Sequence, residues 1–298
     1  MQNNPRAAML CMLCAMLIVG VIDNYVVVLA AHGGLWQFHF IRTLLALPVF
    51  LALAALGVGR LRPINPGVVL LRSVLMAFAM VLYFGCLAFL PLAQVLAGLF
   101  TSPIFVMLLS AIFLGQTIGK WRILAVAIGF SGSLLVLQPD ITNLGILTVL
   151  PVLAGFLYGC SSLITRTLCA GEDTLTLLFG FFVVLGSFGA VGLIVLGLYP
   201  QDVPQGPDGF ILRGWVMPNA TFLTWTAVQA FGSIVAIGSL IRAYQMADAS
   251  FVSVFEYSVM VFGPLAAFWL FGQTLNGIAM MGVAMIILAG TIIAVRAR

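Results

Sequence analysis

Ten apolar stretches follow one another along the chain, and short polar segments separate them. A helix that crosses the hydrocarbon core of a bilayer needs about 20 mainly apolar residues. Each stretch approaches or exceeds that length, and we expect spans over 7–31, 35–57, 68–90, 92–114, 121–138, 144–166, 174–198, 219–243, 250–271 and 276–295. The pattern therefore predicts an all-α integral membrane protein with about ten transmembrane helices.

One polar segment, 199–218, is longer than the other connections. It contains four prolines together with aspartates and glycines, a composition that is typical of loops. We expect a surface loop here, and its Trp215 is placed to lie against the membrane surface.

The second half of the chain echoes the first. When 245–296 is laid over 88–139, the polar triplet Gly272-Gln273-Thr274 falls on Gly115-Gln116-Thr117. Apolar helices resemble one another by composition, so chance is the alternative to a duplication. The same triplet between two apolar runs in both halves favours the duplication.

A duplication divides the chain into a first repeat, 1–139, and a second repeat, 140–298. Because each repeat holds an odd number of spans, five, the second copy enters the membrane from the opposite face. The two repeats are then inverted. Inverted repeats are common among secondary transporters, whose substrate site usually lies between the repeats near the membrane midplane.

Composition agrees with burial in lipid. Hydrophobic residues make up 63% of the chain and charged residues 7%, whereas soluble domains carry about 25% charged residues. The net charge of +4 comes from basic residues scattered among loops, which does not indicate nucleic-acid binding. Five cysteines lie in or beside apolar runs and are interpreted as packing residues. Cys11 and Cys14 form a CxxC without a second Cys/His pair, so we expect no metal site and no cofactor.

The basic residues predict the orientation of the chain in the membrane. If the amino terminus is cytoplasmic, ten of them lie on the inner side or at inner helix ends, Arg213 lies outside and Arg42 lies within a span. The inner ten are Arg6, Arg60, Arg62, Arg72, Lys120, Arg122, Arg166, Arg242, Arg296 and Arg298. Cytoplasmic loops are enriched in Lys and Arg, so we expect both termini in the cytoplasm and a bacterial-type inner membrane.

Asp23 and Arg42 are charged residues inside predicted spans. A charge at the bilayer centre costs about 2.5–3.5 kcal/mol even on insertion scales, so such residues are functional candidates. At about 1.5 Å per residue, both lie roughly 10–12 Å below the outer helix ends. An ion pair or a shared hydrogen-bond network is one interpretation, and direct substrate binding is another. A third interpretation is that the two charges only neutralise each other, or that the Arg42 side chain extends to the lipid headgroups.

Glu256 is the third charge inside a span, about two turns into the ninth. It is a candidate for proton coupling or for a neutral, hydrogen-bonding carboxyl; the alternative is that it faces water at the inner entrance. His39 shares a helix face with Arg42 and is included with the proton-linked candidates. A lone histidine near a helix end is, however, more often structural.

Aromatic and polar residues near mid-span are candidates for lining a substrate cavity, since an amphiphilic metabolite needs an apolar wall with a few polar anchors. They are Asn24, Tyr25, Tyr83, Tyr158, Ser161, Ser162, Trp225, Gln229, Ser233 and Tyr257. The alternative for the serines is that small side chains let helices approach closely. Pro103 and Pro264 are expected to kink the fourth and ninth spans, and Gly115 and Gly272 to act as hinges.

The runs Asn24-Tyr25-Val26 and Phe40-Ile41-Arg42-Thr43-Leu44-Leu45, with the hinges at Gly115 and Gly272, give the chain a family resemblance. It resembles the ten-helix EamA-type exporters of the drug/metabolite transporter superfamily. The resemblance implies export of amino acids or other small metabolites through a central cavity lined by both halves. The branch of this family that exports aromatic amino acids is one subfamily to which the resemblance could assign the chain.

The chain departs from the family pattern after each hinge glycine. The family often has Glu there, whereas this chain has Gln116 and Gln273. An ionic role at these positions is therefore lost, and a helix-terminus or hydrogen-bonding role is left.

We therefore expect a secondary transporter, not an enzyme, that exports small metabolites by alternating access, with aromatic or apolar amino acids as the first candidates. The alternatives are a multidrug or nucleoside-type exporter and a membrane-embedded lipid-handling enzyme. No phosphate-binding loop indicates ATP-driven transport, so export is either proton-coupled or downhill. The expected partners are a small-molecule substrate and the lipid bilayer, without nucleic acid, and a monomer is the simplest assembly.

Overall fold

The computed structural model of the protein describes residues 4–140, 142 and 145–296. Ten helical segments are long and apolar enough to cross a membrane, and each lies within a few residues of its predicted span. In order, the spans are α1–η1–α2 (Pro5–Ile22, Asp23–Tyr25, Val26–His32), α3 (Leu35–Ala55), α4 (Pro66–Cys86), α5–α6 (Leu92–Leu99, Ser102–Leu114), α7 (Lys120–Leu137), η2–α8 (Ile146–Thr148, Val149–Thr167), α9 (Thr174–Leu198), α10 (Ala220–Met246), α11–η4–α12 (Ala249–Val252, Ser253–Ser258, Val259–Phe271) and α13 (Gly277–Arg296). The prediction of an all-α membrane protein is confirmed.

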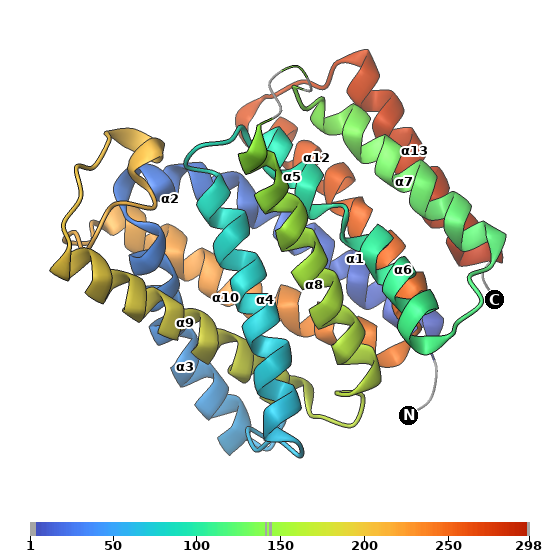
Figure 1. Ribbon diagram of the computed structural model, residues 1–298, viewed down its shortest axis with the longest axis horizontal. Coiled ribbons are helices and arrows are strands. Elements are labelled where there is room, and N and C mark those ends of the chain that lie inside the picture. Colours follow the sequence, from blue (N-terminus) through green and yellow to red (C-terminus); the bar gives the residue numbers. More distant parts are fainter. Residues whose placement is uncertain (1–3, 141, 143–144, 297–298) are drawn as a thin grey trace.

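Helices that are far apart in the sequence pack side by side (Figure 1). The main contacts join α1 to α10, α3 to α9, α4 to α8 and α7 to α13. In span numbers these are the pairs 1–8, 2–7, 3–6 and 5–10. The set is unchanged when the first five spans are exchanged with the last five, as a two-fold relation between the halves requires.

The contact between α7 and α13 depends on glycine. A Cβ added at Gly132 would lie 2.8 Å from the carbonyl oxygen of Gly282, and one added at Gly282 would lie 2.5 Å from that of Gly132. Only a residue without a side chain permits such an approach of two backbones.

The two predicted hinges end α6 and α12 in the same way. Gly115 and Gly272 have φ values of 60° and 67°, in the left-handed region that favours glycine. The backbone N–H of Gln116 donates to Ser110 O at 3.3 Å, and that of Gln273 donates to Ala267 O at the same distance. The polar triplet is therefore a helix-terminating motif in both halves.

Three spans are interrupted along their length. The first passes through η1, the fourth breaks at residues 100–101, and the ninth passes through η4. Pro103, expected to kink the fourth span, lies instead in the first turn of α6, where no backbone N–H is needed for the helix. Pro264 lies inside α12 as expected.

The 199–218 segment contains the short helix η3 (Gly206–Gly209) and folds back onto the ends of α2 and α3. Phe210 is buried, and its carbonyl accepts a hydrogen bond from Leu35 N at 2.8 Å. The Arg213 guanidinium donates to the carbonyls of Ala30 and Gly33, both at 2.8 Å. Trp215 is exposed, in keeping with a position at the membrane surface. We call this side of the molecule the loop face, and the opposite side, where α1 begins and α13 ends, the terminal face.

Candidate functional site

A central cavity of about 120 Å³ lies between the two halves of the chain. Its walls are mostly apolar and include Met16, Met76, Met80, Phe84, Leu96, Leu99, Phe100, Ile237 and Leu240. Polar side chains gather at its two ends. Asp23, Arg42, Tyr83 and Gln229 come from the loop-face halves of their spans, whereas Glu256, Ser102 and Tyr158 lie near mid-span or nearer the terminal face.

The carboxyl group of Glu256 is the centre of the second polar group. The Tyr158 hydroxyl donates to its Oε1 at 3.0 Å, the Tyr244 hydroxyl donates to the same atom, and the Ser102 hydroxyl donates to Oε2 at 3.2 Å. Glu256 is 2% exposed, so it does not face water at the terminal face, which was one of the sequence alternatives. Since a carboxylate only accepts, a protonated Glu256 requires one hydroxyl to change from donor to acceptor.

The charges at the other end are not joined to each other. Asp23 and Arg42 line the same cavity, but among the described residues no direct ion pair connects them, and this part of the sequence expectation is not met. The Gln229 amide donates to Ile22 O at 2.9 Å and to Asp23 Oδ1 at 3.4 Å. Arg42 is 3% exposed, so it does not extend to the headgroups.

The structure also shows a buried cation that the sequence placed at a helix end. Arg72 is 1% exposed, and its guanidinium donates to Thr165 Oγ1 at 3.0 Å and to Leu177 O at 3.2 Å. Ser161 donates to the Arg72 carbonyl at 3.1 Å, so this predicted cavity residue serves the α4–α8 contact instead. Nothing in the local sequence separates Arg72 from a snorkelling arginine.

Tyr25 and Trp225 lie next to the cavity rather than in its lining. Their rings stack with centroids 3.5 Å apart, and Phe271 meets Tyr25 edge-on at 5.6 Å. Tyr25 lies two residues nearer the loop face than Asp23, and Trp225 lies four residues nearer it than Gln229. The stack therefore connects the first, eighth and ninth spans on the loop-face side of the cavity.

The remaining predicted residues divide between the cavity and the packed core. Tyr83 and Ser233 line the cavity, as do Tyr158 and Gln229. His39 lies buried against Phe38 and Phe84, and neither ring nitrogen has a hydrogen-bond partner in the described part of the chain. The residues that do not line the cavity are Asn24, which donates to Gly20 O, the buried Ser162, and Tyr257, which packs against Phe100.

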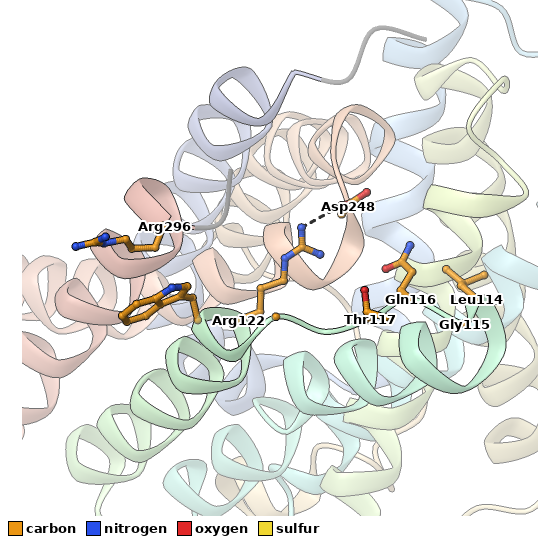
Figure 2. A pocket seen from close by; sticks show the side chains of 9 residues that line it. Leu114, Gly115, Gln116, Thr117, Arg122, Asp248 and Arg296 are labelled. Carbon is orange, nitrogen blue, oxygen red and sulfur yellow. Dashed lines mark hydrogen bonds and ion pairs between the residues drawn. The ribbon is translucent and has the colours of Figure 1, made fainter.

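A second, more polar pocket of about 560 Å³ opens at the terminal face. Figure 2 shows Arg122 extending from the start of α7 to Asp248, with the turn at Gln116 on one side and Arg296 on the other. The Arg122 and Arg166 guanidinium groups lie 3.1 Å and 3.4 Å from the Asp248 carboxylate. We call these three residues the ionic junction; it joins α7 and α8 to the turn before α11.

The cysteines are free thiols. In the connection after α8, burial raises the pKa of the Cys169 thiol to about 11, so this thiol is neutral at physiological pH. Within the part of the chain that the structure describes, no three His, Cys, Asp or Glu side chains are grouped so that they could hold a metal ion.

Comparison with known proteins matches residues 6–138 to the EamA-like transporter family. A riboflavin transporter of Rhizobium johnstonii is 31% identical over 264 residues, which cover 89% of this chain and 80% of that protein. A riboflavin transporter of Vibrio cholerae is 28% identical over 97% of this chain and 93% of its own. A pseudopaline exporter of Pseudomonas aeruginosa is 27% identical over 81% of this chain and 79% of its own.

A solved crystal structure superimposes on the fold with a TM-score of 0.77, at 17% sequence identity and over 98% of both chains. The ten apolar helices, the cavity between the two halves and the similarity to these transporters agree with one another. The chain belongs to the EamA-like transporter family, and it is an integral membrane transporter of small molecules.

Proposed function

We propose that the protein is a secondary transporter that moves a planar, amphiphilic metabolite of the riboflavin type by alternating access through the central cavity. The observation that carries the proposal is a cavity whose middle section is apolar and whose two ends each carry a polar group. A flavin has the matching form, because a flat ring system is joined to a chain of hydroxyl groups. The names of two relatives support this substrate class.

The size of the cavity bears on the transport cycle. Sites for drug-sized ligands enclose about 300–1,000 Å³, and the cavity here encloses about 120 Å³. The conformation is therefore more closed than the loaded state, and the helices around the cavity must separate to admit substrate. The three interruptions are suitable places for that movement, since they lie in spans that line the cavity.

Export of an aromatic or apolar amino acid is the second candidate. It is favoured by the opposite charges of Asp23 and Arg42 at one end of the cavity, which complement a zwitterion. The names of the relatives reported above do not refer to amino acids, so we place this candidate second.

Transport by vesicles that contain only this protein tests both candidates. Vesicles preloaded with riboflavin should take up labelled riboflavin by counterflow, and phenylalanine or a nucleoside should compete weakly. Met80→Trp fills the cavity and should abolish exchange, whereas Ile112→Trp, on an exposed lipid-side position, should not. Exchange of phenylalanine without riboflavin would reject the first candidate in favour of the second.

We also propose that the halves 1–139 and 140–298 are inverted repeats, with both termini in the cytoplasm. The exchangeable helix pairs, the matching ends of α6 and α12, and the distribution of basic residues support this plan. Single cysteines in a cysteine-free background test the orientation. An impermeant thiol reagent added outside cells should label Gln201→Cys at the loop face but not Lys120→Cys. The opposite labelling would reverse the orientation.

A further inference from the structure

Arg42 is a buried cation that has no hydrogen-bond acceptor among the residues that the structure describes. Its side chain lines the cavity and is 3% exposed, and its Nε atom has no partner. None of the hydrogen bonds found among the described residues involves its guanidinium group. The Phe38 and Phe182 rings lie 5.6 Å and 5.3 Å from the guanidinium carbon and supply cation–π contacts only.

Arg72 shows that this arrangement is not a general property of the bundle. It is buried to a similar degree, yet its guanidinium has two acceptors on neighbouring helices. Because burying a charged donor without an acceptor is unfavourable, Arg42 is a group that gains from a ligand oxygen in the cavity.

Asp23 lines the same end of the cavity as Arg42. Among the described residues its carboxylate accepts only the long bond from Gln229, and no acceptor is found for Arg42, so acceptor and donor capacity lie at the same end of the cavity. A ligand that offers only a carboxylate would meet the like charge of Asp23. A ligand that offers only an ammonium would meet the like charge of Arg42. The pair instead complements a polar edge that accepts and donates side by side.

We infer that Asp23 and Arg42 are the specificity-determining pair for the imide edge of a heteroaromatic ring. Arg42 donates to a ring carbonyl oxygen and Asp23 accepts the adjacent ring N–H. An imide is preferred to an amino-acid zwitterion because the imide carries no full charge that must be desolvated in an apolar cavity. The ring then lies along Met76, Met80 and Phe84, and the hydroxyl chain points toward Glu256.

This inference rests on the proposed function, and ligand chemistry can test it separately. The probes are riboflavin and riboflavin methylated at the imide nitrogen, with binding to the purified protein followed by flavin fluorescence. Methylation removes the N–H that Asp23 accepts, so binding to the wild type should weaken about tenfold or more. In Asp23→Ala the two flavins should bind within about twofold of each other, since the interaction that distinguishes them is gone.

Arg42→Gln should weaken both flavins by a similar factor, about tenfold, because the ring carbonyl is present in each. Arg296→Gln is the matched control: it removes an exposed guanidinium that does not line the cavity and should leave both affinities unchanged. Gel filtration and thermal unfolding show whether each variant is folded. If Arg42→Gln does not fold, the comparison of the two flavins on the wild type and on Asp23→Ala still decides.

The outcomes separate the two hypotheses. The inference would be overturned if riboflavin binding did not change on imide methylation and did not change in Asp23→Ala or Arg42→Gln. That result would leave the proposed function in place. Absence of riboflavin binding and of riboflavin exchange by the wild type would overturn both.

Discussion

The charged side chains at the two ends of the central cavity differ in their hydrogen-bond partners. At one end, the Glu256 carboxylate accepts from three hydroxyl groups that come from α6, α8 and α10. At the other end, Asp23 and Arg42 share the cavity without joining, and Arg42 has cation–π contacts in place of an acceptor. The Glu256 group is complete without a ligand, whereas the Asp23–Arg42 end is not.

This difference indicates a division of roles. A satisfied buried network fixes one arrangement of the helices around it, and it changes only when a proton or a helix moves. An unsatisfied charged group instead gains from any ligand that completes it. We therefore propose that the Asp23–Arg42 end recognises the substrate and that the Glu256 end couples proton binding to the conformational change.

The contacts beyond each end differ as well. On the loop-face side, the stacked rings of Tyr25 and Trp225 link the first and eighth spans. On the terminal face, the ionic junction of Arg122, Arg166 and Asp248 links three helical segments. Stacking depends little on ionic strength, whereas partly exposed ion pairs are screened by salt.

The largest expected effect follows from removing the charge of Glu256. Its counterpart in the first half is Leu99, so only one half carries an ionisable group at this position. Such asymmetry lets the two open states differ in proton affinity, as coupling to a gradient requires. Glu256→Gln should abolish flavin accumulation driven by a pH gradient, while counterflow exchange survives. Accumulation at the wild-type level would rule out this role.

The Glu256 network should also contribute strongly to stability. Glu256→Ala leaves three buried hydroxyls without their acceptor, and at about 1 kcal/mol each the free energy of unfolding should fall by about 3 kcal/mol. Ser102→Ala removes one donor and should cost about 1 kcal/mol. Denaturant titration in mixed micelles measures both. Equal losses in the two variants would mean that the hydroxyls do not act through Glu256.

Coupling between Asp23 and Arg42 should be smaller, because no direct ion pair joins them. Asp23→Asn and Arg42→Gln each leave the opposite charge alone in a low-dielectric cavity, whereas the double variant leaves neither. We expect a coupling energy of about 1–2 kcal/mol in a double-mutant cycle of unfolding free energies. Strictly additive effects would show that the two charges are independent.

The smallest expected effect distinguishes the stacked pair Tyr25–Trp225 from the ionic junction by their response to salt. Raising the salt concentration from about 0.1 M to about 1 M shortens the Debye length from about 10 Å to about 3 Å, which weakens the ionic junction. Ser233→Cys in a cysteine-free background reports opening of the cavity through its rate of alkylation. Salt should speed alkylation in the wild-type background but not in Asp248→Asn, by an amount that corresponds to about 1 kcal/mol or less. Trp225→Leu should raise the rate at both salt concentrations alike.

Several features of the protein are determined by the sequence alone. The ten spans follow from hydropathy, because the bilayer imposes length and apolarity on each helix whatever its neighbours are. The ends of α6 and α12 follow from Gly115 and Gly272, because only a local left-handed conformation is required there. The depths of Asp23 and Arg42 follow from counting residues along a helix.

Tertiary structure decided which polar side chains meet. A lipid-buried helix that is apolar all round can rotate about its axis without changing its hydropathy, so sequence did not separate Tyr158, which lines the cavity, from Ser161, which serves Arg72. Tyr244 and Ser102 lie on different spans from Glu256 and carry no signal for that contact. The rotation of each helix is set by contacts with helices far away in the sequence, and that packing also left Arg42 without an acceptor among the described residues.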